Sequence, residues 1–206
     1  YRDPLPGRRT RATIAKEKGL EPLANLILLQ KMTETPLEEA KNYINPEKEV
    51  STAEDALNGA KDILAESVSD NADFRTHIRE LTMKHGQLLS AAKDPEAESV
   101  YEMYYEFSES LSKLAGHRIL AISRGEKEKF LIVKIDAPVD RILSYLDRKL
   151  ITAPSAPTAA VLHEVTEDAY NRLIAPAIER EIRSDLFEKA EDGAIRVFGK
   201  NLEQLL

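Results

Sequence analysis

The spacing of apolar residues is the feature that most restricts how this chain can fold. Over long stretches they recur every three or four positions, which places them on one side of an α-helix. Capping residues and prolines divide the pattern, as in Thr35-Pro36-Leu37-Glu38 and Ser51-Thr52-Ala53-Glu54. The clearest stretches are 20–32, 53–64, 74–81, 139–150, 161–174 and 177–190. The sequence therefore predicts a mainly α fold, a multi-helix bundle of antiparallel hairpins, with helix-turn-helix-like packing as one arrangement that fits.

Local signals predict where several of these helices begin, end and bury their side chains. Asp70 or Asn71 is expected to cap the helix over 74–81, and Gly86 to end it in the left-handed conformation that glycine tolerates. Pro176 is expected to end or kink a helix at Ala175. One broad apolar face is expected on the helix near 20–32, formed by Leu23, Leu26, Ile27 and Leu29.

One short β element interrupts the helical pattern, with a strand expected near 129–135. The run Phe-Leu-Ile-Val-Lys-Ile at 130–135 is rich in aromatic and β-branched residues and lies between a charged turn and Pro138. Because a lone strand leaves its backbone groups unpaired, it needs a neighbour. That neighbour is either elsewhere in this chain or in a part of the protein outside it.

A cluster of basic residues near the start contrasts with the charge of the rest of the chain. Residues 1–18 hold six basic and two acidic side chains, a net +4, which leaves −11 for the remainder of a chain whose total is −7. Since an acidic chain repels phosphate on average, any nucleic-acid contact must come from a local patch. The candidate contacts are Arg8, Arg9 and Arg11, with Lys16 and Lys18 extending the stripe. A solvated basic loop is the alternative.

Nothing in the sequence predicts an enzyme, a cofactor or a bound metal. There is no cysteine, the four histidines lack the spacing of metal ligands, and the glycine-rich phosphate and dinucleotide motifs are absent. Adjacent acidic pairs such as Glu38-Glu39 diverge on a helix. No apolar run has the length of a membrane span or the form of a signal peptide, so we expect a cytoplasmic protein without membrane contact.

The positions of prolines, glycines and a linker suggest that the chain has three segments. Prolines and Gly7 near the start predict a basic irregular arm over 1–19, followed by a helical domain over 20–152 that contains the strand. After the proline-containing linker TAPSAPT, a long helical segment is expected over 153–206. Its apolar pattern runs into the final NLEQLL, so we expect a further domain downstream.

Four phrases, in order, resemble the N-terminal helical region of the Tex family of bacterial transcription accessory proteins, which is related to a eukaryotic transcription elongation factor. They are RRTRATIAKEKGLEPLA at 8–24, AEDALNGAKDILAE at 53–66, GHRILAISRGEKE at 116–128, and EDAYNRLIAPAIEREIRSDLFEKAEDGAIRVFGKNLEQLL at 167–206. The resemblance implies downstream RNase H-like, helix-hairpin-helix and RNA-binding barrel domains. Family members usually begin like YLPYKPKRRTRA, whereas YRDPLPGRRTRA loses two lysines but keeps the RRTRA core.

The resemblance implies a non-catalytic helical scaffold that is associated with nucleic acid, mainly through domains outside this chain, and with the transcription machinery. A first alternative is a protein-protein docking module that uses the aromatic residues between Tyr101 and Phe107, which lie at helical spacing. A second alternative is part of a metal-dependent nuclease, suggested only by the RNase H-like domain that the family carries downstream.

Overall fold

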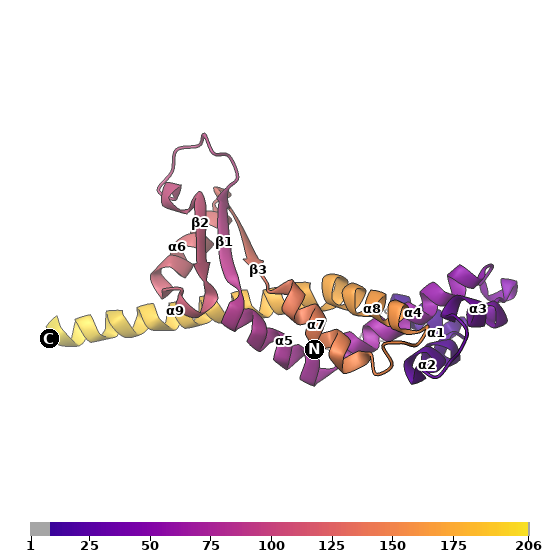
Figure 1. The fold of residues 1–206 in the computed structure, drawn as a ribbon. Helices are drawn as coiled ribbons and strands as arrows, with labels where there is room; N and C mark the ends of the chain where they lie inside the picture. Colours follow the sequence, from indigo (N-terminus) through magenta and orange to yellow (C-terminus); the bar gives the residue numbers. More distant parts are fainter. Residues whose placement is uncertain (1–8, 206) are drawn as a thin grey trace. The chain divides into compact units, whose positions relative to one another are not determined.

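The computed structural model describes residues 9–205, apart from the side chains at 197 and 198 (Figure 1). It confirms a mainly α fold with one small sheet. The α-helices are α1 (Arg11–Glu17), α2 (Glu21–Leu29), α3 (Pro36–Ala40), α4 (Ala53–Asp70), α5 (Ala72–His85), α6 (Gly116–Lys127), α7 (Val139–Leu150), α8 (Ala159–Asp168) and α9 (Ala175–Leu205). The strands are β1 (Gln87–Ala92), β2 (Glu106–Ser110) and β3 (Leu131–Asp136). None of the described helices combines the length and the apolar character needed to cross a bilayer.

The chain forms two compact units, and neither is a continuous segment. The first consists of Tyr1–Arg75 with Ile142–Ala175, and the second of Thr76–Arg141 with Pro176–Leu206. This grouping differs from the expected segments 1–19, 20–152 and 153–206, because residues 142–175 return to the first unit and residues 176–206 belong to the second.

In the first unit, α4 is the central helix, and α1, α2, α3 and α8 contact it. Its small residues allow this close approach, since Ala56, Ala60 and Ala65 are fully buried. Larger buried side chains from the surrounding helices complete the core, among them Leu20, Leu23, Ile27, Leu162 and Val165. The apolar faces whose spacing predicted these helices therefore pack against α4.

Gln30 joins parts of the first unit that are far apart in the sequence. It follows α2 in the left-handed conformation, with φ of 59°, and is 8% exposed. Its amide nitrogen donates to the carbonyl of Leu150 at 2.8 Å, and its amide oxygen accepts from the backbone N–H groups of Thr152 and Ala153 at 2.9 and 3.1 Å. The end of α2 is thus tied to the segment after α7.

Helix caps confirm some local expectations and correct others. The hydroxyl of Thr35 caps α3 and the side chain of Asn71 accepts from Phe74, as the sequence predicts. For α4 the cap is Thr52, one residue later than expected, because Thr52 and not Ser51 accepts from the N–H of Asp55. Gly86 does not have the expected positive φ; a side chain there would overlap the carbonyl of Thr82.

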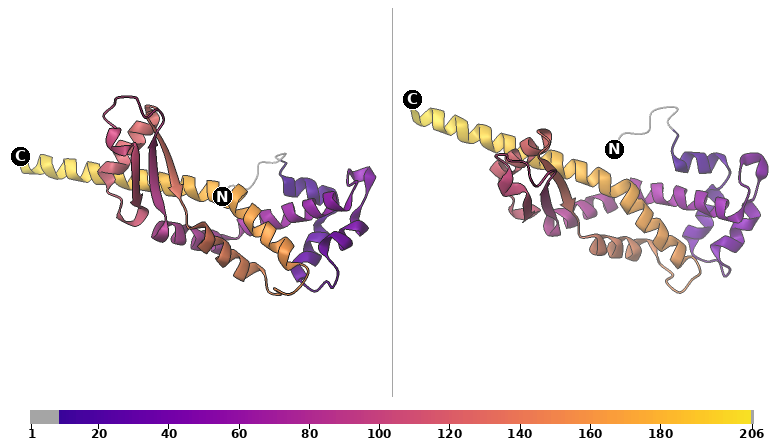
Figure 2. Two further views of the ribbon diagram at one scale, coloured as in Figure 1. Left: turned by 45° about the horizontal axis from the view of Figure 1, so that its top comes forward. Right: turned by 90° about the horizontal axis from the view of Figure 1, so that it is seen from above.

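The second unit holds a three-stranded antiparallel sheet in the order β2-β1-β3 (Figure 2). The predicted strand is β3, and its neighbour β1 lies in this chain, so no strand from outside is needed to pair it. Leu88 of β1 faces Ile135 of β3, and inward residues such as Leu131 and Val133 are buried under α6 and α9. A hydrogen bond from the N–H of Ile135 to Glu179 at 3.4 Å connects the β3 edge to α9.

The aromatic segment after Pro95 is not the helix that its spacing suggested. It forms a 3₁₀ turn, Glu102–Tyr104, and then strand β2, which contains Phe107. Tyr101 and Tyr104 are each 5% exposed, and their rings contact Phe130 and Phe107 respectively. These two tyrosines are core residues of the second unit.

Pro176 does not break the chain's long helical run. A π-helical segment, Ala169–Ile174, connects α8 directly to α9, and Pro176 occupies the second position of α9. The wider π turn is a known way to accommodate a local disturbance of the helical hydrogen bonds. The predicted end or kink at Ala175 is therefore replaced by a change of helix type before it.

Candidate nucleic-acid interface

The basic segment expected as an irregular arm is helical in its second half, because Thr10 begins α1. Thr10 and Thr13 form a reciprocal capping box: the Thr10 hydroxyl accepts from the N–H of Thr13 at 3.1 Å, and the Thr13 hydroxyl accepts from the N–H of Thr10 at 2.7 Å. Ala12 and Ala15 are buried against α4. The local sequence thus fixes one face of α1 and leaves its basic residues on the other sides.

Two of the five candidate contacts precede this helix. Arg8 lies outside the described residues. Arg9 forms an ion pair with Glu17 at 2.6 Å, and both side chains are about 60% exposed. Because an exposed pair of this kind contributes little energy, Arg9 can exchange Glu17 for another anion at low cost.

Arg11 and Lys18 line the same groove between α1 and α4. They are seven residues apart, which is nearly two turns of helix, so they share one side. The groove has a volume of about 290 Å³. Its other lining residues are Ile14, Ala15, Leu20, Glu49, Asp55, Asn58, Gly59 and Asp62.

The wall opposite Arg11 and Lys18 is acidic, which decides what the groove can accept. Asp55 and Asp62 are seven residues apart on α4 and so lie on the same side of it. A phosphate placed between Arg11 and this wall would meet two carboxylates. The groove suits a group that carries both signs of charge better than it suits a polyanion.

The charge of Arg11 is balanced further by a small ionic network within the first unit. Arg172 binds Asp168 through two nitrogens, at 2.8 and 3.1 Å, and lies 3.9 Å from Asp62. Burial raises the pKa of Asp62, while Arg172 and then Arg11 act against this rise. The hydrogen bond from Arg172 lowers the pKa of Asp168. Arg11 therefore helps to keep these two half-buried carboxylates ionised.

Lys16 lies on a different side of α1 from Arg11 and Lys18. Five residues separate it from Arg11, a rotation of about 140° around the helix. Lys16 is exposed, and among residues 9–205 no carboxylate lies within 4.0 Å of its ammonium group. The helix thus divides the expected stripe: Arg11 and Lys18 line the groove with the acidic wall, whereas Lys16 faces solvent on another side and Arg9, which precedes the helix, pairs with Glu17.

The acidic wall is the part that the sequence analysis missed. Its signal was present, since Asp55, Asn58 and Asp62 recur at helical spacing within 53–70. What the sequence could not show is that α1 packs against this side of α4.

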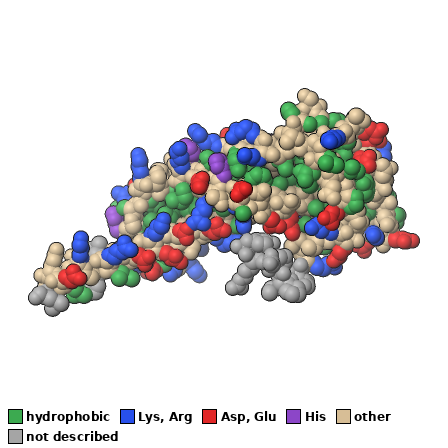
Figure 3. Space-filling view, turned by 90° about the horizontal axis from the view of Figure 1, so that it is seen from below, with side chains coloured by type: hydrophobic (Ala, Val, Ile, Leu, Met, Phe, Trp, Pro, Cys, Tyr) green, Lys and Arg blue, Asp and Glu red, His purple; other side chains and the backbone are tan. Residues whose placement is uncertain are grey.

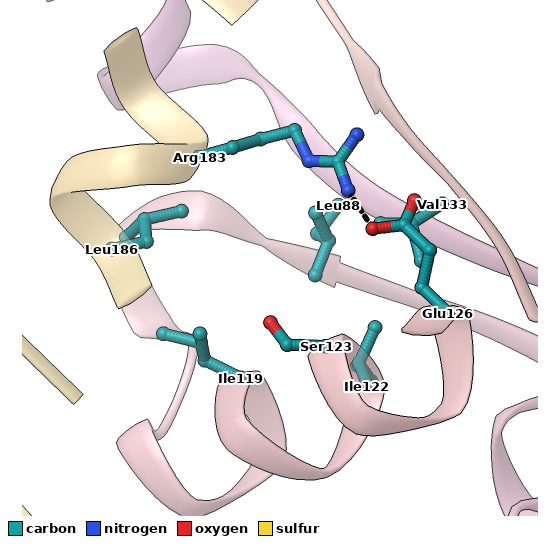
Figure 4. Close-up of a pocket in the computed structure, with 8 residues that line it drawn as sticks. All are labelled: Leu88, Ile119, Ile122, Ser123, Glu126, Val133, Arg183 and Leu186. Carbon is teal, nitrogen blue, oxygen red and sulfur yellow. Dashed lines mark hydrogen bonds and ion pairs between the residues drawn. The ribbon is translucent and has the colours of Figure 1, made fainter. Parts of the chain in front are cut away.

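One hollow of the second unit is too small to hold a cofactor. Figure 4 shows it between α6, the sheet and α9, with the ion pair of Glu126 and Arg183 at its edge. Its volume is about 30 Å³, and it is lined by Leu88, Ile119, Ile122, Ser123, Glu126, Val133, Arg183 and Leu186. This space is enough for one water molecule. Within the described part of the chain, no group of three or more His, Asp or Glu side chains is placed to hold a metal ion.

Comparison with known proteins agrees with the four phrases quoted above. Residues 31–198 match the Tex central region-like family. The chain is 48% identical to the uncharacterized protein YdcI of Bacillus subtilis over 100% of its own length and 29% of that protein. It is 38% identical to the protein tex of Bordetella pertussis, over 98% of its own length and 27% of that protein. Human S1 RNA-binding domain-containing protein 1 is 33% identical over 96% of the chain and 21% of the human protein. The chain thus spans less than a third of each of these relatives.

Proposed function

Because this chain belongs to the Tex family, we propose that it is a non-catalytic helical scaffold of a transcription accessory protein and that α1 contacts nucleic acid. A relative whose name includes an S1 RNA-binding domain supports the association with nucleic acid. The main binding would come from domains outside this chain, with a cytoplasmic location and the transcription machinery as partner. The downstream RNase H-like, helix-hairpin-helix and RNA-binding barrel domains remain part of this proposal.

The observation that carries the proposal is the exposed position of Lys16 on a capped helix, with Arg9 exposed directly before that helix. Residues 1–18 have a net charge of +4 in a chain that is otherwise acidic. The helix holds Lys16 in place, and the ion pair with Glu17 keeps Arg9 next to the helix, so a phosphate backbone can bind them without first ordering residues 9–17. Such contacts position a nucleic acid but do not read its sequence.

The five candidate residues have different roles in this proposal. Arg8, Arg9 and Lys16 supply the phosphate contacts, and Arg11 and Lys18 mainly hold α1 against the acidic wall of α4. Binding should therefore depend on Lys16 more than on Arg11. It should also weaken steeply with salt, because each phosphate contact releases a counterion.

The experiment is fluorescence anisotropy of labelled single- and double-stranded RNA and DNA with the chain, at several salt concentrations. We expect Lys16→Ala to weaken binding equally for all sequences and to reduce the salt slope by about one. Lys31→Ala, which removes an exposed lysine outside α1, is the matched control and should change neither quantity. Equal effects of Lys16→Ala and Lys31→Ala would show that α1 has no special part in binding.

A second variant tests the role of Arg9 without removing a basic side chain. Glu17→Gln breaks the ion pair and frees the guanidinium of Arg9. Since exposed pairs are worth about 0.2–1 kcal/mol, affinity for RNA should rise by about 1.4- to 5-fold at low salt. No change, together with a loss on Lys16→Ala, would confine the contact to Lys16.

The nuclease alternative has a direct test. Cleavage of RNA or DNA by this chain that requires a divalent metal, and that survives purification to homogeneity, would overturn the non-catalytic proposal.

A further inference from the structure

The groove between α1 and α4 has a lining that the proposed contact with nucleic acid does not use. Arg11 and Lys18 line it from α1, and Asp55 and Asp62 line it from α4. Between these charges the lining is apolar or small, formed by Ile14, Ala15, Leu20 and Gly59. The volume of about 290 Å³ is close to the lower end of the range of small-molecule sites. The groove is therefore large enough for a small ligand.

The two helices run in opposite directions along the groove, which fixes the order of its charges. A methyl group at Gly59 would lie 3.3 Å from the Cβ of Ala15. About one turn further along α4 is Asp62, whose ionisation is influenced by Arg11, about one turn earlier in α1. Asp55 lies one turn before Gly59, so it belongs to the other end. The two ends are about 10 Å apart along the helix axis.

The charged side chains of the groove differ from other exposed charges of the first unit. Figure 3 shows acidic and basic side chains next to one another on one face of the molecule. Three direct ion pairs of the first unit are Arg9 with Glu17 at 2.6 Å, Lys41 with Glu38 at 3.0 Å, and Lys61 with Glu164 at 2.6 Å. Within residues 9–205, by contrast, none of Arg11, Lys18 and Asp55 has an opposite charge within 4.0 Å. These side chains face one space but do not bind each other.

At one end of the groove, the group without a direct partner is a cation. Asp62 lies 3.9 Å from Arg172, which also binds Asp168 at 2.8 Å. The guanidinium of Arg11 makes no hydrogen bond with any residue that the structure describes. Its planar fork of N–H donors matches the two oxygens of a carboxylate. This end therefore favours a carboxylate group.

At the other end, carboxylates outnumber cations among the lining residues. Glu49 and Asp55 line the groove together with Lys18. Lys48 is near, with its Nζ 3.6 Å from the position that a Cβ on Gly19 would take, but it is not one of the lining residues. Two carboxylates beside one lysine can accept hydrogen bonds from a further ammonium group. This end therefore favours an ammonium group.

We propose that the groove binds a linear zwitterion, a molecule whose carboxylate and ammonium groups are joined by a short apolar chain. The carboxylate binds Arg11, the ammonium binds Asp55 and Glu49, and the methylenes lie over the apolar middle of the groove. A chain of five methylenes separates the two charges by about 7 Å, so with a hydrogen bond of about 3 Å at each end it reaches both sets of residues. A polyanion does not fit this order of charges, so the site is separate from the proposed contact with nucleic acid.

The test is an NMR titration of the isotope-labelled chain with ε-aminocaproic acid, which has five methylenes between its charged groups. Hexanoic acid and hexylamine, each with one of the two charges, are the ligand controls. We expect the amide signals of α1 and α4 to shift with ε-aminocaproic acid. Each control ligand should bind at least about tenfold more weakly, because one end of the groove then has no partner. Equal binding of ε-aminocaproic acid and hexylamine, or no shift in α1 and α4, would overturn the proposal.

Variants at each end separate the two charged contacts. Arg11→Gln and Asp55→Asn should each weaken binding of ε-aminocaproic acid at least about tenfold. Lys31→Gln and Glu54→Gln, at exposed positions outside the groove, are the matched controls and should stay within about twofold of the parent chain. Circular dichroism shows whether each variant keeps its helix content. If Asp55→Asn is folded and binds like Glu54→Gln, the proposal is wrong, whatever Arg11→Gln does to the position of α1.

The same chemistry occurs at the end of a protein chain, because a C-terminal lysine carries an ammonium group and a carboxylate. The peptide Ala-Ala-Lys is therefore compared with its C-terminal amide and with ε-aminocaproic acid. Tighter binding of the peptide would assign the groove to a chain terminus, and tighter binding of ε-aminocaproic acid would assign it to a free zwitterion. Amidation should weaken binding of the peptide at least about tenfold. Equal binding of the peptide and its amide would contradict the contact between Arg11 and a carboxylate.

Discussion

At the scale of single residues, Gln30 stabilises the first unit through the hydrogen bonds of its side-chain amide, although it is a polar residue in a largely buried position. Both ends of its amide are used, by Leu150 on one side and by Thr152 and Ala153 on the other. These backbone groups belong to the last residue of α7 and to the segment that follows it, where the helix supplies no partners for them. A shorter side chain at position 30 would leave them unpaired in a largely buried place.

Gln30→Ala is therefore expected to lower the free energy of unfolding by about 1–3 kcal/mol, the usual cost of leaving buried backbone groups without a partner. Urea denaturation followed by circular dichroism measures this change. Asn25→Ala, at an exposed position on α2, is the control and should change stability by less than about 0.5 kcal/mol. A loss below that value for Gln30→Ala would mean that water replaces the amide.

The role of Gln30 also shows which residue-level features the sequence can predict. Thr35 and Asn71 cap helices that begin within three residues of them, so their signals are local and the predictions are confirmed. Gln30 bonds to groups 120 to 123 residues away, and no local pattern contains that information. The acidic partners of Arg11 were missed for the same reason.

At the scale of elements, His163 connects α8 to α7 through an ionisable contact. Its Nδ1 lies 2.7 Å from a carboxylate oxygen of Asp147, and its Nε2 lies 3.1 Å from Glu167. The hydroxyl of Thr166 also donates to Asp147, at 2.6 Å. The hydrogen bond to Asp147 is the main cause that raises the pKa of His163 above its ordinary value.

A raised pKa makes this connection depend on pH. The protonated ring stabilises the folded chain fully below the pKa of the unfolded state, about 6.5, and this contribution is lost as pH rises through the folded pKa. His163→Gln should therefore destabilise the chain more at pH 5.5 than at pH 9, as measured by the urea midpoint.

His85→Gln is the control, and its effect on stability is expected to depend on pH in the opposite direction. Desolvation, and then the charges of Arg141 and Lys84, lower the pKa of His85, so protonation opposes folding there. That substitution should favour the folded state more at pH 5.5 than at pH 9. The same pH dependence for both variants would contradict the assignment of the effect to the Asp147 contact.

The sheet shows where prediction of elements fails. Strand β3 has a run of β-branched residues that few helices would contain, and it was predicted within one residue of its end. Its partner β1 reads Gln-Leu-Leu-Ser-Ala-Ala, which has no β-branched residue and is held in the strand by pairing on both sides. The segment that contains β2 was misread because its aromatic residues also fit helical spacing.

At the scale of the whole molecule, each of the two units is built from two separate segments of the chain. Prolines, glycines and linkers mark local breaks, so they could not reveal these units. The linker TAPSAPT is a strong local break, yet the residues on both sides of it belong to the first unit. Each unit has its own buried core, with Leu23, Ile27 and Leu162 in the first, and Ile122 and Leu131 in the second. Substitutions at two glycines test whether the two cores are destabilised independently of each other.

Gly59 and Gly125 lie at close approaches, one in each unit. A methyl group at Gly59 would overlap Leu20, and one at Gly125 would overlap Leu131 and lie 3.1 Å from Tyr101. Each substitution by alanine should cost about 1–3 kcal/mol, because the neighbouring side chains must move within a packed core. Gly193 has no atom within 4 Å of the same position, so Gly193→Ala should instead stabilise α9 by up to about 1 kcal/mol.

Hydrogen exchange followed by mass spectrometry gives the readout, since it resolves protection segment by segment. Gly59→Ala should reduce protection in α1, α2 and α4 and leave β1, β3 and α6 unchanged. Gly125→Ala should do the reverse, because Leu131 belongs to the second core. If either substitution lowers protection equally in both sets, the two units unfold as one cooperative body. In that case a scaffold role would require a single folding unit, and the basic helix α1 would be sensitive to changes far from it in the chain.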